Sequence, residues 1–426
     1  ALDVNGKPLS NLVVWMDKRG REYAEHVNQL IGIERYYQTA GHSISYITGA
    51  SKVLWFHSEG GEAWEECAVI GSPQTYFLKR LGSDNLVIDY SSGTYHFPMD
   101  IDIKEWSREI AKELDFPLEK LPQIVSAVDV VGYLPQSVAQ ELRLKAGIPI
   151  IAGGGDGQCA AAGSGAIVPG ICMINIGTGT GIQFYLEKPT RNPGMVFSCS
   201  GHVVPDAWES EGHTQASGAV FRWFRDEFGD KEYEGEDDRG FNELVDEAML
   251  APPTAEGLLF LPTFNGCTTP RQEPNARGCL LGLSLNHKKS HVIRAVLEGI
   301  TLEIKWILES FKETGARVDE IRLVGGGSRN IHWNQIHADI LDHPVSTVQY
   351  PDAAMVGCAM CAAVGLGEYP TLLEASKHFI RIKEEFIPQA KNKAIYQTLY
   401  TDYVNAFNQI TQSSIFKDVE KRIGMS

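Results

Sequence analysis

Short apolar segments alternate along the chain between the spacing of strands and the spacing of helices. Runs with the length and composition of strands lie at 124–131, 149–152, 171–176, 183–186 and 320–324. Apolar residues at helical spacing recur at 106–114, 137–144, 158–165, 217–228, 290–314 and 331–341. This alternation predicts an α/β protein with a first unit over residues 1–168 and a second over residues 169–426.

Four further segments carry local signals. The 290–314 pattern is the longest helix, with Ser290 able to cap its start and Gly315 able to end it. A turn at Asn5-Gly6 is typical of a hairpin, and the apolar run at 9–15 predicts the strand after it. The small apolar residues of 355–365 predict a buried helix, and the acidic stretch 232–238 predicts a solvated loop.

Three glycine-rich turns each follow a predicted strand. They are Gly153–Gly157, Gly177–Gly181 and Gly325–Gly327. Glycine lets the backbone approach a ligand closely and aim its N–H groups at phosphate oxygens. The three turns therefore predict ligand contacts at the ends of strands.

The first turn also holds a carboxylate, Asp156. A carboxylate that only helped to bind phosphate would repel it, so Asp156 suits a base that takes a proton from a hydroxyl. A turn aspartate without chemistry is the alternative. The pattern Gly155-x-Gly157-x-x-Ala160 also meets a dinucleotide fingerprint, which expects an acid about twenty residues later. That place holds Asn175–Thr178, which disfavours a dehydrogenase.

The second and third turns point to a nucleotide. Gly177, Thr178, Gly179 and Thr180 lie between two predicted strands and resemble the phosphate clamp of actin-like ATPases, although a plain hairpin is the alternative. The three successive glycines at 325–327 would admit a flat ligand such as adenine, although a strand-to-helix connection would also explain them.

The Trp15-Met16-Asp17-Lys18-Arg19 segment ends the predicted strand at 9–15. Strand alternation would put Trp15, Asp17 and Arg19 on one face, where a ring, an acceptor and a donor suit a polyol. The alternative is a surface ion pair beside a half-buried tryptophan. Gly218 and Arg222, taken alone, are a helix-start glycine and a solvated arginine.

Composition narrows the function classes. The 54 acidic and 38 basic residues give a net charge of −16, which argues against a nucleic-acid or anionic-membrane partner. No apolar run in the sequence is long enough to span a bilayer. The eight cysteines, including Cys358-x-x-Cys361, form no repeated spacing and predict reduced thiols in a cytoplasmic protein.

Taken in order, these motifs resemble the FGGY family of carbohydrate kinases, and among them its xylulokinase-like members. The resemblance covers nearly the whole chain and rests on order and spacing. It is carried by Trp15-x-Asp17-x-Arg19, Gly153-Gly154-Gly155-Asp156, Gly177-Thr178-Gly179-Thr180, Thr269-Pro270 with Pro274-Asn275-Ala276-Arg277-Gly278, and Leu323-Val324-Gly325-Gly326-Gly327-Ser328.

The resemblance implies two actin-like (ribonuclease H-like) domains around a cleft and ATP-dependent phosphorylation of a sugar, with magnesium. It implies that Asp156 is the base and that Trp15, Asp17 and Arg19 bind sugar with it. It further implies ATP contacts at the remaining motif positions, namely Gly177, Thr178, Gly179, Thr180, Gly218, Arg222, Gly326, Gly327 and Asn330.

The resemblance also sets the open alternatives. The family begins with a strand and an Asp-x-Gly-Thr-type phosphate loop that this sequence does not contain, so we expect an upstream segment and a first domain without its N-terminal strands. The expected substrate is a ketopentose such as xylulose. Glycerol, ribulose or gluconate kinases, and a non-catalytic nucleotide-binding homologue, are the alternatives, and a homodimer is compatible with the sequence.

Overall fold

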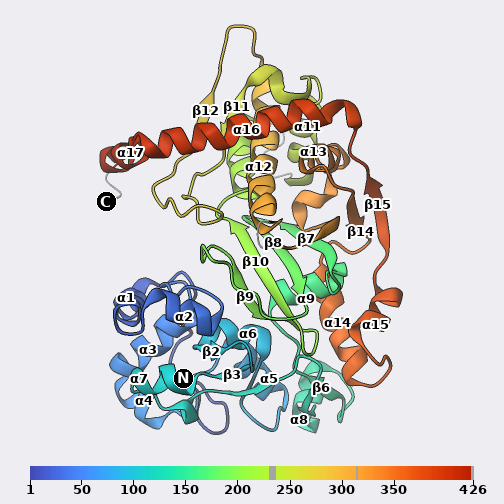
Figure 1. The fold of residues 1–426 in the computed structure, drawn as a ribbon. Helices are drawn as coiled ribbons and strands as arrows, with labels where there is room; N and C mark the ends of the chain where they lie inside the picture. Colours follow the sequence, from blue (N-terminus) through green and yellow to red (C-terminus); the bar gives the residue numbers. More distant parts are fainter. Residues whose placement is uncertain (230–236, 313–314, 424–426) are drawn as a thin grey trace. The chain divides into compact units, whose positions relative to one another are not determined.

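A computed structural model of the protein describes residues 1–229, 237–312 and 315–423 and confirms an α/β architecture (Figure 1). The chain forms two compact units, each made of separate stretches. The first unit contains residues 1–167, 185–210 and 354–379, and the second contains 168–184, 211–353 and 380–426. The boundary between residues 168 and 169 that the sequence suggests for two domains stays a prediction.

Helices dominate the first unit, and its strands are short. Its α-helices are α1 (Arg21–Leu30), α2 (Ile33–Ala40), α3 (Gly49–Glu59), α4 (Gly61–Glu66), α5 (Pro73–Leu81), α6 (Tyr90–His96), α7 (Arg108–Glu113), α8 (Gln136–Leu142), α9 (Asp156–Ser164) and α15 (Leu372–Phe379), with nearly all of α14 (Ala353–Gly365). Its strands are β1 (Val87–Asp89), β2 (Met99–Asp100), β3 (Glu105–Trp106), β4 (Gln123–Val125), β5 (Val130–Tyr133), β6 (Pro149–Ile151) and β9 (Ser198–Gly201).

Strand pairs and one tightly packed helix support the first glycine turn. β1 pairs in parallel with β4, and β6 pairs antiparallel with β5 and leads through the turn into α9. The small residues of α9 are buried, and a Cβ added at Gly357 of α14 would lie 1.9 Å from the Cys159 carbonyl oxygen. The two helix backbones therefore approach closely, which explains why small apolar residues occupy both segments.

The second unit contains the longer strands and helices. Its helices are α10 (Gly218–Phe228), α11 (Asp237–Ala248), α12 (Lys289–Lys312), α13 (Ile331–Leu341), α16 (Ala390–Gln412) and α17 (Ile415–Ile423). Its strands are β7 (Gly170–Ile176), β11 (Leu259–Leu261), β12 (Cys279–Leu281), β13 (Val318–Val324), β14 (Val345–Val348) and β15 (Ile382–Phe386), with most of β8 (Thr180–Leu186) and β10 (Trp208–Thr214).

A mixed sheet of seven strands has the order β15-β14-β13-β7-β8-β10-β9. β13 lies parallel to both β7 and β14, whereas β8 runs antiparallel to β7. The carboxyl ends of the parallel neighbours β7 and β13 are followed by the glycine turns at Gly177 and Gly325. Parallel pairing thus brings these two turns to the same edge of the sheet.

Helix α12 forms the core of the second unit and packs against α13, α16 and β11. It confirms the predicted long helix, although the last two positions of the prediction, 313–314, lie outside the described residues. The predicted helices α7, α8, α9, α10 and α13 and the predicted strands β6, β7, β8 and β13 are also present. Positions 232–236 of the predicted polar loop lie outside the described residues, and α11 begins at Asp237.

Two strand predictions are wrong. The expected strand at 124–131 is divided into β4 and β5, because Asp129 closes a turn by accepting from the Ser126 N–H at 2.9 Å. The expected strand at 9–15 does not form: the Asn5-Gly6 turn is present and Leu2 bridges Pro8, but the following residues pair with no strand in the described structure. Leu12 and Trp15 are exposed instead of covering a core.

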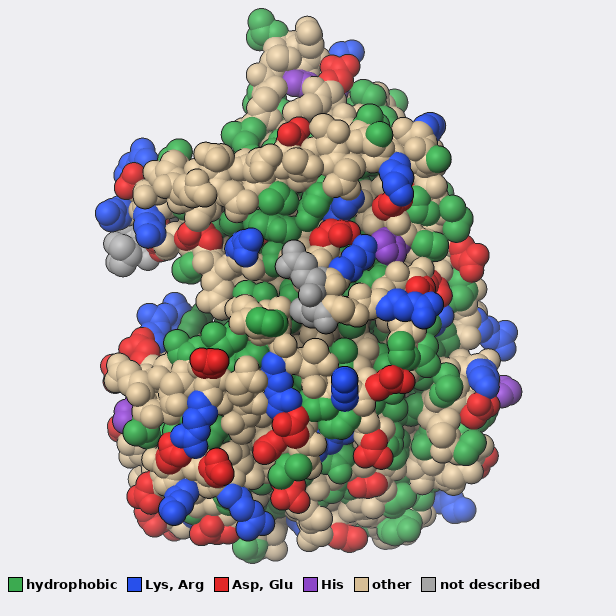
Figure 2. Space-filling model, viewed as in Figure 1, with side chains coloured by type: hydrophobic (Ala, Val, Ile, Leu, Met, Phe, Trp, Pro, Cys, Tyr) green, Lys and Arg blue, Asp and Glu red, His purple; other side chains and the backbone are tan. Residues whose placement is uncertain are grey.

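Charge is distributed over the surface. Figure 2 shows acidic and basic side chains interspersed on the face in view. Within the described ranges, no helix is long and apolar enough to cross a membrane. The eight cysteines, all in described residues, form no disulfide with one another; Cys358 is exposed and Cys361 is buried.

Candidate functional site

A cavity of about 470 Å³ lies in the second unit, where the two glycine turns meet helices α10 and α11. It contains most of the residues that the sequence assigned to a nucleotide. Its lining consists of Ile176, Gly177, Thr178, Gly218, Phe221, Arg222, Phe241, Asn242, Val245, Gly326, Gly327, Arg329, Asn330 and Trp333.

Backbone hydrogen bonds hold the Gly177–Gly181 turn and the start of α10 together. The N–H groups of Gly218 and Ala219 donate to the carbonyl oxygens of Gly177 and Thr178 at 3.1 and 3.0 Å. A Cβ at Gly218 would lie 2.1 Å from the Gly177 oxygen, so this approach requires glycine. The turn is thereby fixed with the Thr178 side chain exposed at the cavity.

The Gly325–Gly327 turn contributes two glycines with different roles. A Cβ at Gly327 would lie 2.4 Å from Ile176 Cγ2, whereas a Cβ at Gly326 would meet no atom within 4 Å. Gly327 therefore serves close packing between the two turns. Gly326 instead leaves open space at the cavity wall.

Two of the predicted nucleotide residues do not line the cavity. Thr180 is buried, and its hydroxyl shares a 2.7 Å hydrogen bond with that of Ser217. Gly179 is also absent from the lining, and a Cβ there would lie 2.6 Å from the Thr214 carbonyl oxygen. Both residues contact neighbouring protein groups that support the turn. Their contact with a nucleotide stays a prediction.

Helix α11 supplies cavity residues that the sequence analysis missed. Asn330 caps α13: its Oδ1 accepts from the N–H groups of His332 and Trp333, so its Nδ2 is left to donate to Asn242 Oδ1 at 2.8 Å. Phe241 lies beside Asn242 on α11, and its ring is 5.3 Å from that of Phe221. The acidic residues up to Asp238 were interpreted as a solvated loop, so no helix was predicted for this segment.

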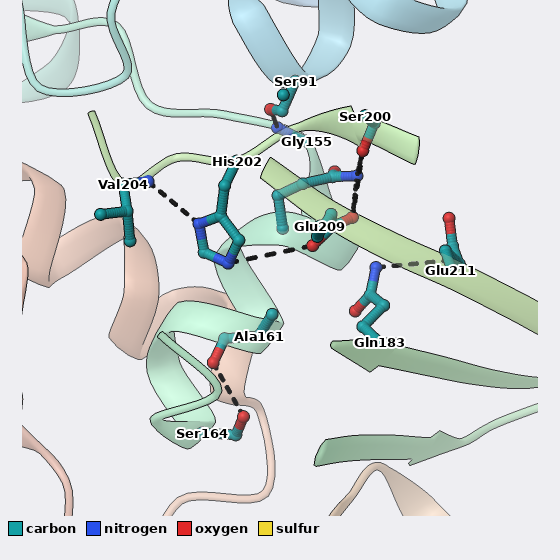
Figure 3. A network of polar contacts seen from close by, with 12 residues as sticks. Ser91, Gly155, Ala161, Ser164, Gln183, Ser200, His202, Val204, Glu209 and Glu211 are labelled. Carbon is teal, nitrogen blue, oxygen red and sulfur yellow. Dashed lines mark hydrogen bonds and ion pairs between the residues drawn. The ribbon is translucent and has the colours of Figure 1, made fainter. Parts of the chain in front are cut away.

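Asp156 begins α9 in the first unit, as the glycine turn predicts. The side chain is exposed, and its Oδ1 accepts from the Gly157 N–H at 2.8 Å. The preceding residue, Gly155, donates its N–H to Ser91 Oγ at 2.9 Å (Figure 3). Asp156 is therefore an accessible carboxylate on a turn that is itself held in place.

A buried polar network lies behind the first turn of α9. Gln158 Nε2 donates to Glu209 Oε1 at 2.6 Å, and Ser200 Oγ donates to the same oxygen at 3.3 Å (Figure 3). His202 Nε2 is 3.9 Å from Glu209 Oε2, and burial lowers the pKa of His202 to about 3. The imidazole is thus neutral near pH 7, and its Nδ1 accepts from the Val204 N–H.

The Trp15–Arg19 segment has a different geometry from the one predicted. Asp17 caps the short 3-10 helix Lys18–Gly20 and accepts from Arg19 Nη2 at 2.7 Å, and this pairing lowers the pKa of Asp17 to about 2. The Arg19 guanidinium lies 4.3 Å from the ring centre of Trp55, while Trp15 is 61% exposed. The predicted placement of all three side chains on one strand face is wrong, because no strand forms; their contact with sugar stays a prediction.

Comparison with family models matches both parts of the chain. The model described as "FGGY family of carbohydrate kinases, N-terminal domain" matches residues 1–163, and its C-terminal counterpart matches residues 172–366.

Curated relatives align with nearly the whole of this chain. The chain is 30% identical to the xylulose kinase of Bacillus subtilis and 29% identical to that of Lactococcus lactis, covering 95% and 97% of this chain and 80% and 81% of the relatives. It is 26% identical to a Bacillus subtilis gluconokinase over 97% of this chain and 81% of that protein.

Among solved structures, the ligand-bound xylulose kinase of Lactobacillus acidophilus has a TM-score of 0.87 at 23% identity, covering 96% of this chain and 82% of that one. Plasmodium falciparum glycerol kinase with ADP has a TM-score of 0.83, also at 23% identity, covering 95% and 81%. These matches confirm the two-domain fold of sugar kinases. The chain belongs to the FGGY family of carbohydrate kinases, enzymes that transfer a phosphoryl group from ATP to a sugar.

Proposed function

We propose that this kinase phosphorylates a hydroxyl of a ketopentose such as xylulose, with Asp156 as the general base and ATP bound in the cavity of the second unit. The observation that carries the nucleotide assignment is the convergence of Gly177, Thr178, Gly326 and Asn330 on one cavity. Its glycine turns admit phosphates and a flat base, and its aromatic side chains provide apolar surface.

The proposed reaction follows from the carboxylate on the first unit. Asp156 accepts the proton of the sugar hydroxyl as the oxygen attacks the γ-phosphorus of ATP. The bond from that phosphorus to the oxygen bridging the β- and γ-phosphates breaks, and ADP leaves with the electron pair. The products are a sugar phosphate and ADP, and the proton leaves Asp156 for solvent.

Magnesium is the expected companion of ATP in this family. The described residues contain no group of three or more His, Cys, Asp or Glu side chains placed to hold a metal ion. A magnesium ion arriving with ATP would be held mainly by phosphate oxygens and water, as is common for this cation.

The identity of the sugar is the most specific part of the proposal. The relatives with 29–30% identity are named xylulose kinases, which supports a ketopentose. The gluconokinase relative at 26% makes a sugar acid the first alternative.

A substrate panel tests the proposal. ADP formation is measured with the complete protein, ATP and magnesium, and with xylulose, ribulose, gluconate, glycerol or ribitol in turn. We expect the largest kcat/KM for a ketopentose. A preference for gluconate or glycerol would retain the kinase and replace the substrate, whereas no stimulation by any compound would contradict the proposed activity.

A further inference from the structure

Asp89 is a fully buried carboxylate that the proposed reaction does not use. It ends β1 and caps α6, where its Oδ2 accepts from the Ser91 N–H at 2.8 Å and its Oδ1 from the Ser92 N–H at 3.1 Å. Burial raises the pKa of Asp89, and these hydrogen bonds partly oppose that rise. A buried acid of this kind needs a structural or functional reason.

The Ser91 hydroxyl connects Asp89 to the Asp156 turn. Ser91 Oγ lies 2.5 Å from Asp89 Oδ2 and 2.9 Å from the Gly155 nitrogen. Ser91 has one hydroxyl hydrogen, which it donates to the carboxylate, so its oxygen is free to accept from the Gly155 N–H. The order of donors is therefore fixed: Gly155 donates to Ser91, and Ser91 donates to Asp89.

Packing fixes the same turn from other directions. A Cβ at Gly154 would lie 2.3 Å from Val203 Cγ1 and 3.0 Å from Ser91 Oγ, so the backbone of the turn rests directly on these groups. Gln74 Nε2 donates to the carbonyl oxygens of Ala152 and Gly153 at 3.1 and 3.2 Å, while its Oε1 accepts from the Asp89 N–H. Asp89 thus contacts two side chains that hold the residues before Asp156: its carboxylate accepts from Ser91, and its backbone N–H donates to Gln74.

We propose that Ser91 is a positioning residue for Asp156: oriented by the buried Asp89 carboxylate, its hydroxyl holds the Gly155 amide and so fixes where α9 presents the base. This inference rests on the proposed function. Gly155 is the N-cap of α9 and Asp156 its first residue, so a shift of the Gly155 amide moves the carboxylate directly. Small displacements of a reacting group lower the rate steeply.

The experiment compares two fully buried serines of the first unit. Ser91→Ala removes the acceptor of the Gly155 amide and the hydroxyl donor to Asp89. Ser164→Ala is the matched control, because Ser164 is equally buried and donates to the Ala161 carbonyl at 2.8 Å at the far end of α9. Ser91→Thr retains a hydroxyl at the same backbone position. Each variant is assayed for kcat, KM for ATP, KM for the sugar selected from the panel, and melting temperature.

We expect Ser91→Ala to lower kcat by about 10- to 100-fold. Its KM for ATP should stay within about twofold of wild type, because the nucleotide cavity is built from other residues. Ser91→Thr should recover most of the loss, and Ser164→Ala should keep its kcat whatever its melting temperature.

Two results would overturn the inference. One is a normal kcat in Ser91→Ala, and the other is an equal loss of kcat in Ser91→Ala and Ser164→Ala at matched loss of melting temperature, which would indicate general destabilisation. Failure of the proposed function looks different: the wild type would then form no ADP with any sugar, or Asp156→Asn would keep full turnover, and the positioning role would fall with it.

Discussion

The glycine turns of the second unit and the Trp15–Arg19 segment were both predicted as ligand sites from local motifs, but their groups are used differently in the structure. Four of the fourteen residues that line the cavity are glycines, and backbone hydrogen bonds between strand ends and helix starts set the geometry of the turns that carry them. In the Trp15–Arg19 segment, the polar groups are occupied with each other: Asp17 pairs with Arg19, and Arg19 stacks on Trp55.

This difference shows that a motif is most predictive where its backbone determines the site. The turns at Gly177 and Gly326 follow long strands with fixed partners, so their positions follow from the sheet. The Trp15 motif depends on a strand that finds no partner among the described residues, and its side chains then satisfy one another. We infer that the cavity is ready for its ligand, whereas the Asp17–Arg19 pair has to exchange partners for a sugar to bind there.

The largest expected effect is that of Asp156→Asn, which keeps the shape of the side chain and removes its basicity. We expect kcat to fall by about 100-fold or more, while the affinity for ATP and the melting temperature stay near those of wild type. Steady-state kinetics with the best panel sugar and calorimetric titration with ATP measure the two quantities. Near-normal turnover in this variant would remove Asp156 as the base.

Gly326→Leu tests whether the open space beside Gly326 is where the nucleotide binds. The new side chain meets no protein atom at its Cβ, so the fold should tolerate it, and we expect KM for ATP to rise about tenfold or more with KM for sugar little changed. Gly327→Leu is the structural control, since its Cβ would collide with Ile176 and lower the melting temperature. If Gly326→Leu weakened both ligands equally, misfolding would be the better explanation.

Asp17→Ala probes the Trp15–Arg19 segment. A sugar hydroxyl that exchanges into the Asp17–Arg19 pair would lose its acceptor, and we expect KM for the sugar to rise about tenfold, equivalent to ~1.4 kcal/mol, with KM for ATP unchanged. Asp102→Ala is matched to it, because Asp102 forms a comparable exposed ion pair with Arg191 at 2.6 Å. Equal kinetics in the two variants would leave Asp17 as a surface ion-pair partner only.

Glu303 in α12 does not line the cavity, so it provides a test of the stability of the second unit that is independent of ligand binding. Burial raises the pKa of this carboxyl to about 8 from an unfolded value near 4.5, and its Oε2 has no hydrogen-bond partner in the described structure. Between these values the folded state retains a proton that the unfolded state has lost, so rising pH lowers the free energy of unfolding by up to ~1.4 kcal/mol per pH unit.

Glu303→Gln should therefore be more stable than wild type at pH 8, and the difference should shrink towards pH 5. Denaturant unfolding of both proteins across this range measures it. A difference that does not change with pH would show that Glu303 does not carry this proton.

The parts of the fold that were predicted correctly have local signals. Asn330 caps α13 with its side chain, and the strands around Gly177 have continuous apolar runs. The parts that were missed depend on contacts between distant residues. Ser91 and Gly155 are 64 residues apart, and no pattern in either segment points to the other. Likewise, Asn242 lines the cavity and accepts a hydrogen bond from Asn330, which is 88 residues away in the sequence.

The most direct test of the account follows the γ-phosphate of ATP carrying a radioactive label. The complete wild-type protein is incubated with labelled ATP, magnesium and xylulose, and the products are separated by chromatography. We expect label in a sugar phosphate, formed in proportion to ADP. Two results would contradict the proposed kinase activity. One is label found only in inorganic phosphate, and the other is label retained in ATP with xylulose and with every other sugar of the panel.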